Sequence, residues 1–156
     1  MKKLTLVLFV LMLALLILPS CTKKDGVESN KAPMTCKLDG KNWEAVDSLS
    51  FAQKMRYSDG AEGISLRFAR RSYEGKYGEF TINHKPPKIG DFDMDVNSVF
   101  KTNDPLEQTY FVKSGKISIT KIDDLHVEGT FSLKAANFDD SKSINVTDGK
   151  FNVKYK

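Results

Sequence analysis

The sequence predicts an all-β domain over residues 34–156, an antiparallel and meander-like sandwich or barrel of about eight to ten strands. From residue 34 onward, apolar and polar residues alternate with a period of two, which is typical of half-buried strands. Three Asp-Gly pairs favour tight hairpin turns, and turn signals recur every 8 to 12 residues or so. No segment of this region shows the periodicity of an amphipathic helix.

The three Asp-Gly pairs are expected to close hairpins, because Asp-Gly favours the turn types that match strand twist. In each hairpin the implied register places apolar residues opposite apolar residues, and a slip by one would turn them to solvent. The expected pairs are Cys36 with Trp43 and Met34 with Ala45 at Asp39-Gly40; Met55 with Ile64 and Phe51 with Phe68 at Asp59-Gly60; and Val146 with Phe151 and Ile144 with Val153 at Asp148-Gly149.

Further short strands are expected between these hairpins. Gly129 lies inside one of them and indicates a bulge or a close backbone approach. A turn is expected at Asp123-Asp124. The expected strands cover residues 79–83, 91–96, 108–113, 117–119 and 127–133.

The N-terminus has the plan of a secretory signal. Lys2 and Lys3 precede an apolar run of about 15 residues, which is shorter than the 20 or so needed to span a bilayer comfortably. The segment Leu18-Pro19-Ser20-Cys21 resembles the lipobox of bacterial lipoproteins. That resemblance implies signal cleavage between Ser20 and Cys21, a lipid on the Cys21 sulfur and fatty acyl chains such as palmitate as the membrane anchor.

Three segments follow from this interpretation: a signal peptide over residues 1–20, a lipidated flexible tether over residues 21–33, and the β domain. The residue after the cysteine is Thr22 rather than Asp, which by resemblance favours the outer membrane. Whether the protein would face the periplasm or the cell surface is left open.

Composition limits the partners. The formal charge of +4 includes Lys2 and Lys3, and residues 1–20 contain no acid, so the processed chain carries +2. Such a small excess is weak evidence for an acidic partner, and export argues against nucleic acid. With Cys21 lipidated, only Cys36 remains; its place on an apolar strand face indicates a small buried side chain rather than a nucleophile.

Several side-chain groups could carry chemistry, and each also has a structural explanation. Asp91, Asp93 and Asp95 lie at period two but lack the Gly and Glu of an EF-hand, so they indicate a polar strand face or an adventitious cation site. The basic residues of the middle third either solubilise edges and loops or bind phosphate and sulfate groups of a glycolipid. They are Arg67, Arg70, Arg71, Lys76, Lys85 and Lys88, with Tyr73 and Tyr77 between them.

Neither histidine suggests a metal site, and no metal or cofactor is predicted. We expect His84 in a loop and His126 in a local hydrogen bond beside Asp123-Asp124. The aromatic residues are expected mostly on inward faces, where they either pack a core or line a ligand cavity. These are Trp43, Phe51, Phe68, Phe80, Phe111, Phe131 and Phe151. Asp47-Ser48-Leu49 resembles a bacterial O-glycosylation acceptor.

Several segments of the domain resemble a family of small Bacteroidetes outer-membrane lipoproteins with an all-β domain of unknown function. They are residues 34–45, 87–92, 114–120, 127–133 and 146–151. The resemblance implies the fold and the membrane anchor but no catalytic residue. We therefore expect a non-enzymatic binding or structural protein, anchored at Cys21, with an unidentified protein, glycan or glycolipid partner. A lipocalin-like carrier of a small apolar or glycolipid ligand, and an enzyme acting on envelope glycans, are the alternatives.

Overall fold

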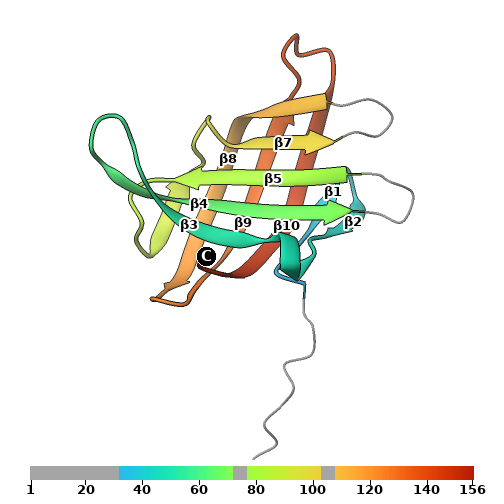
Figure 1. Ribbon diagram of the computed structural model, residues 1–156. Helices are drawn as coiled ribbons and strands as arrows, with labels where there is room; N and C mark the ends of the chain where they lie inside the picture. Colours follow the sequence, from blue (N-terminus) through green and yellow to red (C-terminus); the bar gives the residue numbers. More distant parts are fainter. Residues whose placement is uncertain (1–31, 72–76, 103–107) are drawn as a thin grey trace, which may run out of the picture.

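The computed structural model describes residues 32–71, 77–102 and 108–156 (Figure 1). This part of the chain contains ten strands, one short 3-10 helix and no α-helix, which confirms the all-β prediction. The elements are β1 (Met34–Leu38), β2 (Lys41–Glu44), η1 (Asp47–Leu49), β3 (Phe51–Arg56), β4 (Glu62–Arg71), β5 (Tyr77–His84), β6 (Gly90–Asp93), β7 (Val99–Thr102), β8 (Gln108–Ile122), β9 (His126–Ala136) and β10 (Ser143–Lys154).

All ten strands belong to one antiparallel sheet that folds over on itself. The strand order is β2-β1-β10-β9-β8-β7-β5-β4-β3, and β6 pairs separately with β8. From β3 to β10 this is the expected meander, while the β1–β2 hairpin adds to the far side of β10. Figure 1 shows β3, β4, β5 and β7 as one layer that crosses the layer of β8, β9 and β10 at a steep angle. The sheet does not close into a barrel, although Ala52 of β3 forms an isolated parallel bridge with Tyr155.

The core lies between the two layers and is rich in aromatic rings. Phe80 is 1% exposed; its ring stacks on Phe100 at 4.4 Å between centroids and meets Trp43 edge-on at 5.2 Å. Phe68, Phe131 and Phe151 extend the cluster. Offset and edge-to-face pairs of this kind add to the free energy gained from burial. Side chains thus occupy the interior that a lipocalin-like carrier would need to keep open.

Two of the aromatic residues expected to face inward lie outside this core. Phe51 is partly exposed, and the cations of Arg67 and Lys156 lie 5.8 and 5.0 Å from its ring centroid. Phe111 is 38% exposed. The prediction of an inward position is therefore wrong for both, and Ala52, fully buried, takes the inward position beside Phe51.

The first hairpin has the predicted register. Cys36 pairs with Trp43, and the Ala45 amide donates to the Met34 carbonyl at 2.9 Å. Asp39 and Gly40 have φ values of 46° and 80°, as a type I′ turn requires.

The second hairpin differs from the prediction by one residue. Met55 pairs with Gly63, and Phe51 pairs with Arg67. The loop has three residues rather than two, because the Tyr57 amide donates to the Ala61 carbonyl at 2.8 Å. In this loop only Gly60 has positive φ, 80°, which is the pattern of a three-residue loop ending in a glycine bulge.

The third predicted hairpin is wrong. Residues 143–154 form the single strand β10, which pairs with β9 from Ser143 opposite Ala136 to Lys154 opposite His126. Asp148, with φ of 54°, lies in a bulge inside the strand. A Cβ atom on Gly149 would collide with the ring of Phe131. This glycine therefore lets Phe131 pack directly against the backbone of β10, and it does not form a turn.

The remaining strands match the expectations with three differences. The strand expected over residues 91–96 ends at Asp93 as β6, and β7 has no counterpart among the expected strands. Residues 108–113 and 117–119 belong to one long strand, β8, with a bulge between Val112 and Ser114. The turn at Asp123-Asp124 is confirmed. Both predictions for Gly129 are confirmed. A bulge in β8 lies opposite it, and its backbone closely approaches the Ser118 carbonyl.

Candidate functional site

A polar trough hollows the outer face of six strands, on the side of the sheet away from the core. Its volume is about 1020 Å³, and it is open to solvent. Each strand contributes two polar side chains at positions i and i+2. From β2, β1 and β10 they are Asn42, Glu44, Thr35, Lys37, Asp148 and Lys150. From β9, β8 and β6 they are Thr130, Ser132, Lys116, Ser118, Asp91 and Asp93.

The trough follows from strand alternation. The residue between each pair points to the opposite face, because successive side chains of a strand alternate. On four of the strands those intervening residues are buried in the core: Cys36, Trp43, Ile117 and Phe131. The same six strands therefore present an apolar face inward and a polar face outward.

One row of side chains crosses all six strands in register. Glu44 pairs with Thr35, Thr35 with Lys150, and Lys150 with Thr130. Thr130 then pairs with Ser118, and Ser118 with Asp91. With neighbouring strands about 4.8 Å apart, this row is roughly 24 Å long.

The charges of the second row are paired. Lys37 Nζ lies 2.8 Å from Asp148 Oδ2, and Lys116 Nζ lies 2.6 Å from Asp93 Oδ1. The hydrogen bond between Lys37 and Asp148 raises the pKa of the lysine and lowers the pKa of the carboxyl. Exposed pairs of this kind add little to the free energy of folding, so their main effect is to hold side chains along the trough.

The first row holds groups without partners. Within the described residues, the carboxylates of Glu44 and Asp91 and the ammonium of Lys150 form no ion pair, and the hydroxyls of Thr35 and Thr130 form no hydrogen bond. Thr120, just outside the trough, differs because its hydroxyl donates to the Glu128 carbonyl at 3.2 Å. The row thus offers free donors and acceptors across the sheet.

The three aspartates do not share one face as predicted. Asp91 and Asp93 line the trough, but β6 ends at Asp93, and Asp95 lies outside both the strand and the trough. Asp95 instead accepts hydrogen bonds from the backbone and side-chain nitrogens of Asn97, both at 2.8 Å, and from the Tyr57 hydroxyl at 3.3 Å. Among the residues described, no group of three or more His, Cys, Asp or Glu could hold a metal ion.

The basic residues of the middle third lie at separate places. Arg67 pairs with Glu79 at 2.7 Å on the outer side of β4 and β5. Lys85 pairs with Asp59 at 2.6 Å beyond the end of β5. Arg70 is exposed near the end of β4, which finishes at Arg71, and Tyr77 begins β5. Lys88 lies 6.0 Å from the ring centroid of Phe92. Tyr73 and Lys76 lie outside the described residues.

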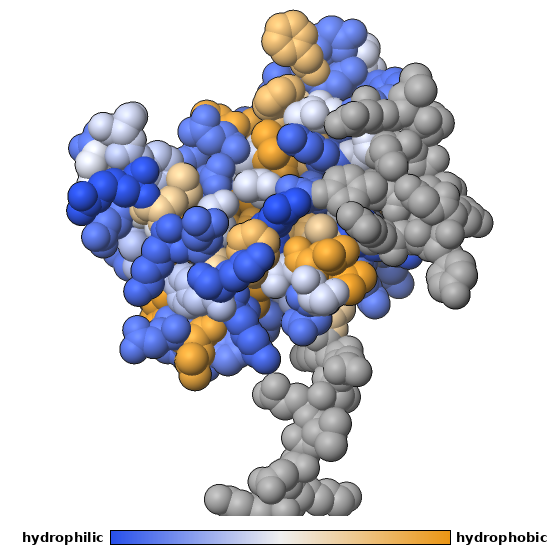
Figure 2. All heavy atoms as spheres, viewed as in Figure 1, coloured by the Kyte–Doolittle hydropathy of each residue, from blue (hydrophilic) through white to orange (hydrophobic). Residues whose placement is uncertain are grey.

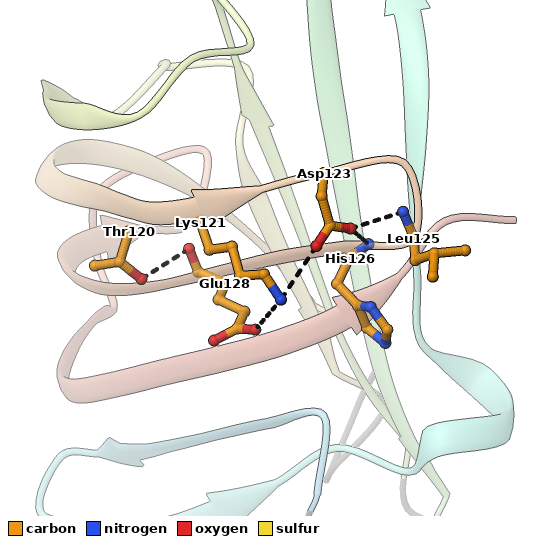
Figure 3. Close-up of polar contacts among 6 residues, drawn as sticks. All are labelled: Thr120, Lys121, Asp123, Leu125, His126 and Glu128. Atoms are coloured by element: carbon orange, nitrogen blue, oxygen red, sulfur yellow. Dashed lines mark hydrogen bonds and ion pairs between the residues drawn. The ribbon is translucent and has the colours of Figure 1, made fainter.

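His126 takes part in the local hydrogen bond that the sequence predicts, through its backbone. The amides of His126 and Leu125 donate to Asp123 Oδ1 at 2.7 and 2.8 Å, and Lys121 Nζ lies 3.1 Å from Asp123 Oδ2 (Figure 3). These backbone bonds are the main cause that lowers the pKa of Asp123 to about 2. The imidazole of His126 points away from this carboxylate (Figure 3).

His84 is not a loop residue, as predicted, but the last residue of β5. It is 1% exposed, and its ring lies 4.4 Å from that of Phe92 between centroids. Within the part of the chain that the structure describes, its Nε2 atom has no hydrogen-bond partner, and burial lowers the pKa of the imidazole. Alternation could have revealed this position, because His84 continues the inward series of Phe80 and Ile82.

Cys36 is buried, as predicted, on the core side of the trough floor. Desolvation raises the pKa of its thiol to about 12, so the thiolate is scarcely populated at neutral pH. The outer hydroxyls and lysines of the trough were not singled out in the sequence. Their spacing at every second residue is visible in the sequence. The strand order, which brings them together on one face of the sheet, is not.

Other predicted features lie at the margin of the described chain or beyond it. Ser20 and Cys21, and with them the cleavage and lipidation sites, lie outside the described residues. Asp47-Ser48-Leu49 forms η1, and Ser48 is exposed there.

None of the described helical segments is long and apolar enough to cross a membrane. The face shown in Figure 2 is mostly hydrophilic, with apolar side chains scattered over it.

Comparison with known proteins gives one match, at the level of the domain. No curated protein and no solved structure matches the chain. Residues 30–153 match the model of a family described as "Domain of unknown function (DUF6252)", and the chain belongs to that family.

Proposed function

We propose that the protein is a lipid-anchored, non-enzymatic binding protein of the bacterial outer membrane, and that the trough is its binding surface. The anchor is supported by the lipobox resemblance at Ser20 and Cys21 and by the resemblance of the domain to small Bacteroidetes lipoproteins.

The trough is the observation that carries the binding role. Its side chains project from six hydrogen-bonded strands rather than from loops, so the backbone positions that carry them are set before a ligand arrives. Preorganisation of this kind lowers the entropic cost of binding. The free groups of Glu44, Asp91 and Lys150 would exchange water for ligand without breaking an ion pair of the protein.

Labelling of cells with a radioactive or clickable palmitate tests the anchor. The wild-type chain should carry the label, and Cys21→Ser should abolish it. Cys36→Ser is the matched control, because it removes the other cysteine and should leave the label unchanged. Equal labelling of wild type and Cys21→Ser would refute the anchor.

Photo-cross-linking on intact cells tests the binding surface. A photoreactive amino acid at Thr130 should capture a partner that the same residue at Thr81, on β5 and outside the trough, does not capture. Capture at both positions, or at neither, would contradict a binding role for the trough.

A further inference from the structure

We propose that the trough binds an uncharged or weakly charged glycan, extended across the strands from β2 to β6. This inference rests on the proposed function and names the ligand class of the same surface. It follows from three properties of the trough: its charge balance, the polar outward side chains of its strands and its hydroxyl-rich central row.

The charge balance disfavours a polyanion. The trough has three lysines against four carboxylates, and two of the lysines are already neutralised by ion pairs with Asp93 and Asp148. A site for phosphate or sulfate groups needs unpaired cations that converge on one point. Among the described residues, Lys150 is the one lysine of the trough without an ion pair; its charge helps to lower the pKa of Asp148, and its row ends in the carboxylates of Glu44 and Asp91.

The lining also disfavours an apolar ligand. The outward-pointing side chains of the trough are hydroxyls, carboxylates, ammonium groups and one amide, while polar and apolar atoms share its exposed surface about equally. The apolar residues beneath it, including Ile117 and Phe131, are 1% and 4% exposed and point into the core. An acyl chain laid in the trough would remove water from the charged groups of Glu44, Asp91 and Lys150 without offering them a partner, which is costly.

The central row suits a polyhydroxyl ligand. Each of the Thr35, Thr130 and Ser118 hydroxyls can donate one hydrogen bond and accept others, Glu44 and Asp91 accept, and Lys150 donates. Sugar hydroxyls are likewise both donors and acceptors, so they can satisfy every group of this row. The short hydroxyl side chains let a ring approach the sheet between the longer side chains.

The dimensions favour a chain of sugars over a single ring. The row from Glu44 to Asp91 is roughly 24 Å long at the usual strand spacing. The groups without partners lie at both of its ends as well as in its middle. Affinity should therefore rise with oligosaccharide length until the row is filled.

Titration of the full-length chain, in a detergent without a sugar head group, tests the inference. The probes are neutral oligosaccharides of increasing length and varied linkage, sulfated counterparts, anionic phospholipid vesicles and basic peptides. We expect binding of neutral oligosaccharides that strengthens with length. In the double variant Thr130→Val/Ser118→Ala the affinity should fall by about tenfold or more, while Thr81→Val, the control outside the trough, should bind as wild type does.

Three results would overturn the glycan assignment: no binding of any neutral oligosaccharide, binding confined to sulfated sugars, vesicles or peptides, or binding that the double variant leaves unchanged. Cross-linking from Thr130 separates this failure from failure of the proposed function. Capture of a protein there without glycan binding would keep the trough as a binding surface and reject the ligand class. No capture, together with no binding of any probe, would reject both.

Discussion

Replacement of His84 by Phe should remove an acid-sensitive loss of stability from this domain. The imidazole of His84 is 1% exposed, and burial is the largest cause that lowers its pKa below the ordinary value of 6.5, against an opposing attraction from Asp95. The folded state therefore disfavours the charged imidazole, whereas the unfolded chain takes up the proton near pH 6.5. As the pH falls, the unfolded chain is protonated first and the free energy of unfolding decreases.

The magnitude follows from proton linkage. Between the unfolded and the lower folded pKa, one proton separates the two states, and each pH unit costs up to about 1.4 kcal/mol. From pH 6.5 to pH 5.0 the wild-type protein should thus lose up to about 2 kcal/mol. The carboxyls with lowered pKa, among them Asp123 at about 2, contribute stability that is lost only as the pH falls below the unfolded value of 3.8. The window above pH 5.0 therefore excludes the loss of stability from these carboxyls.

Urea unfolding at several pH values between 7.5 and 5.0 measures this effect. His84→Phe keeps a ring against Phe92 and should give a flatter profile than wild type, while Phe138→Leu, a control at an exposed side chain, should keep the wild-type slope. If wild type and His84→Phe lose stability in parallel over this range, the interpretation of His84 as a buried neutral group is wrong.

Three further substitutions or reagents test the core and the sheet. Phe80→Ala should cost about 3–5 kcal/mol in urea unfolding, because the ring is 1% exposed, whereas Phe138→Ala, at a side chain that is 91% exposed, should change the midpoint little. Gly129→Ala should cost about 1–3 kcal/mol, since the new Cβ would press against the Ser118 carbonyl; a variant as stable as wild type would contradict that geometry. The Cys36 thiol should resist iodoacetamide at pH 8 until urea unfolds the domain, as peptide mapping would show; rapid labelling of the folded protein would contradict its burial.

Local signals were sufficient for the first hairpin but not for the other two. At Asp39-Gly40 both turn residues have positive φ, so a two-residue loop fixes the register. At Asp59-Gly60 the aspartate instead accepts the Ala61 amide at 3.0 Å, which lengthens the loop by one residue. The same dipeptide thus encodes two registers, because the hydrogen bond made by the Asp side chain selects the loop length.

At Asp148-Gly149 the apolar pattern was compatible with two structures. Val146 faces Phe151 in the predicted hairpin, but in the protein it pairs with Leu133 of β9. Both pairings bury apolar side chains, so alternation alone does not distinguish a turn from a bulge within one strand. The choice depends on β9, whose long apolar face needs β10 as a continuous partner.

The trough shows a different limit of sequence reasoning. The outward residues of each strand are ordinary solvent-facing positions when taken one strand at a time, and nothing marks Thr130 or Lys150 as special. They acquire a joint role only because β1 and β2 join the far side of β10 and β6 pairs with β8. These are contacts between segments far apart in the chain, and the local alternation of apolar and polar residues does not predict them.

The two faces of these strands also separate stability from binding. The core depends on the inward residues, so Phe131 and Ile117 are costly to change, while their neighbours Thr130 and Ser118 face water. A β-branched replacement such as Thr130→Val keeps the strand preference and removes only the free hydroxyl. Substitutions on the trough face should therefore alter ligand affinity with little change in the urea midpoint, and a trough variant that unfolds the domain would show that the two faces are not independent.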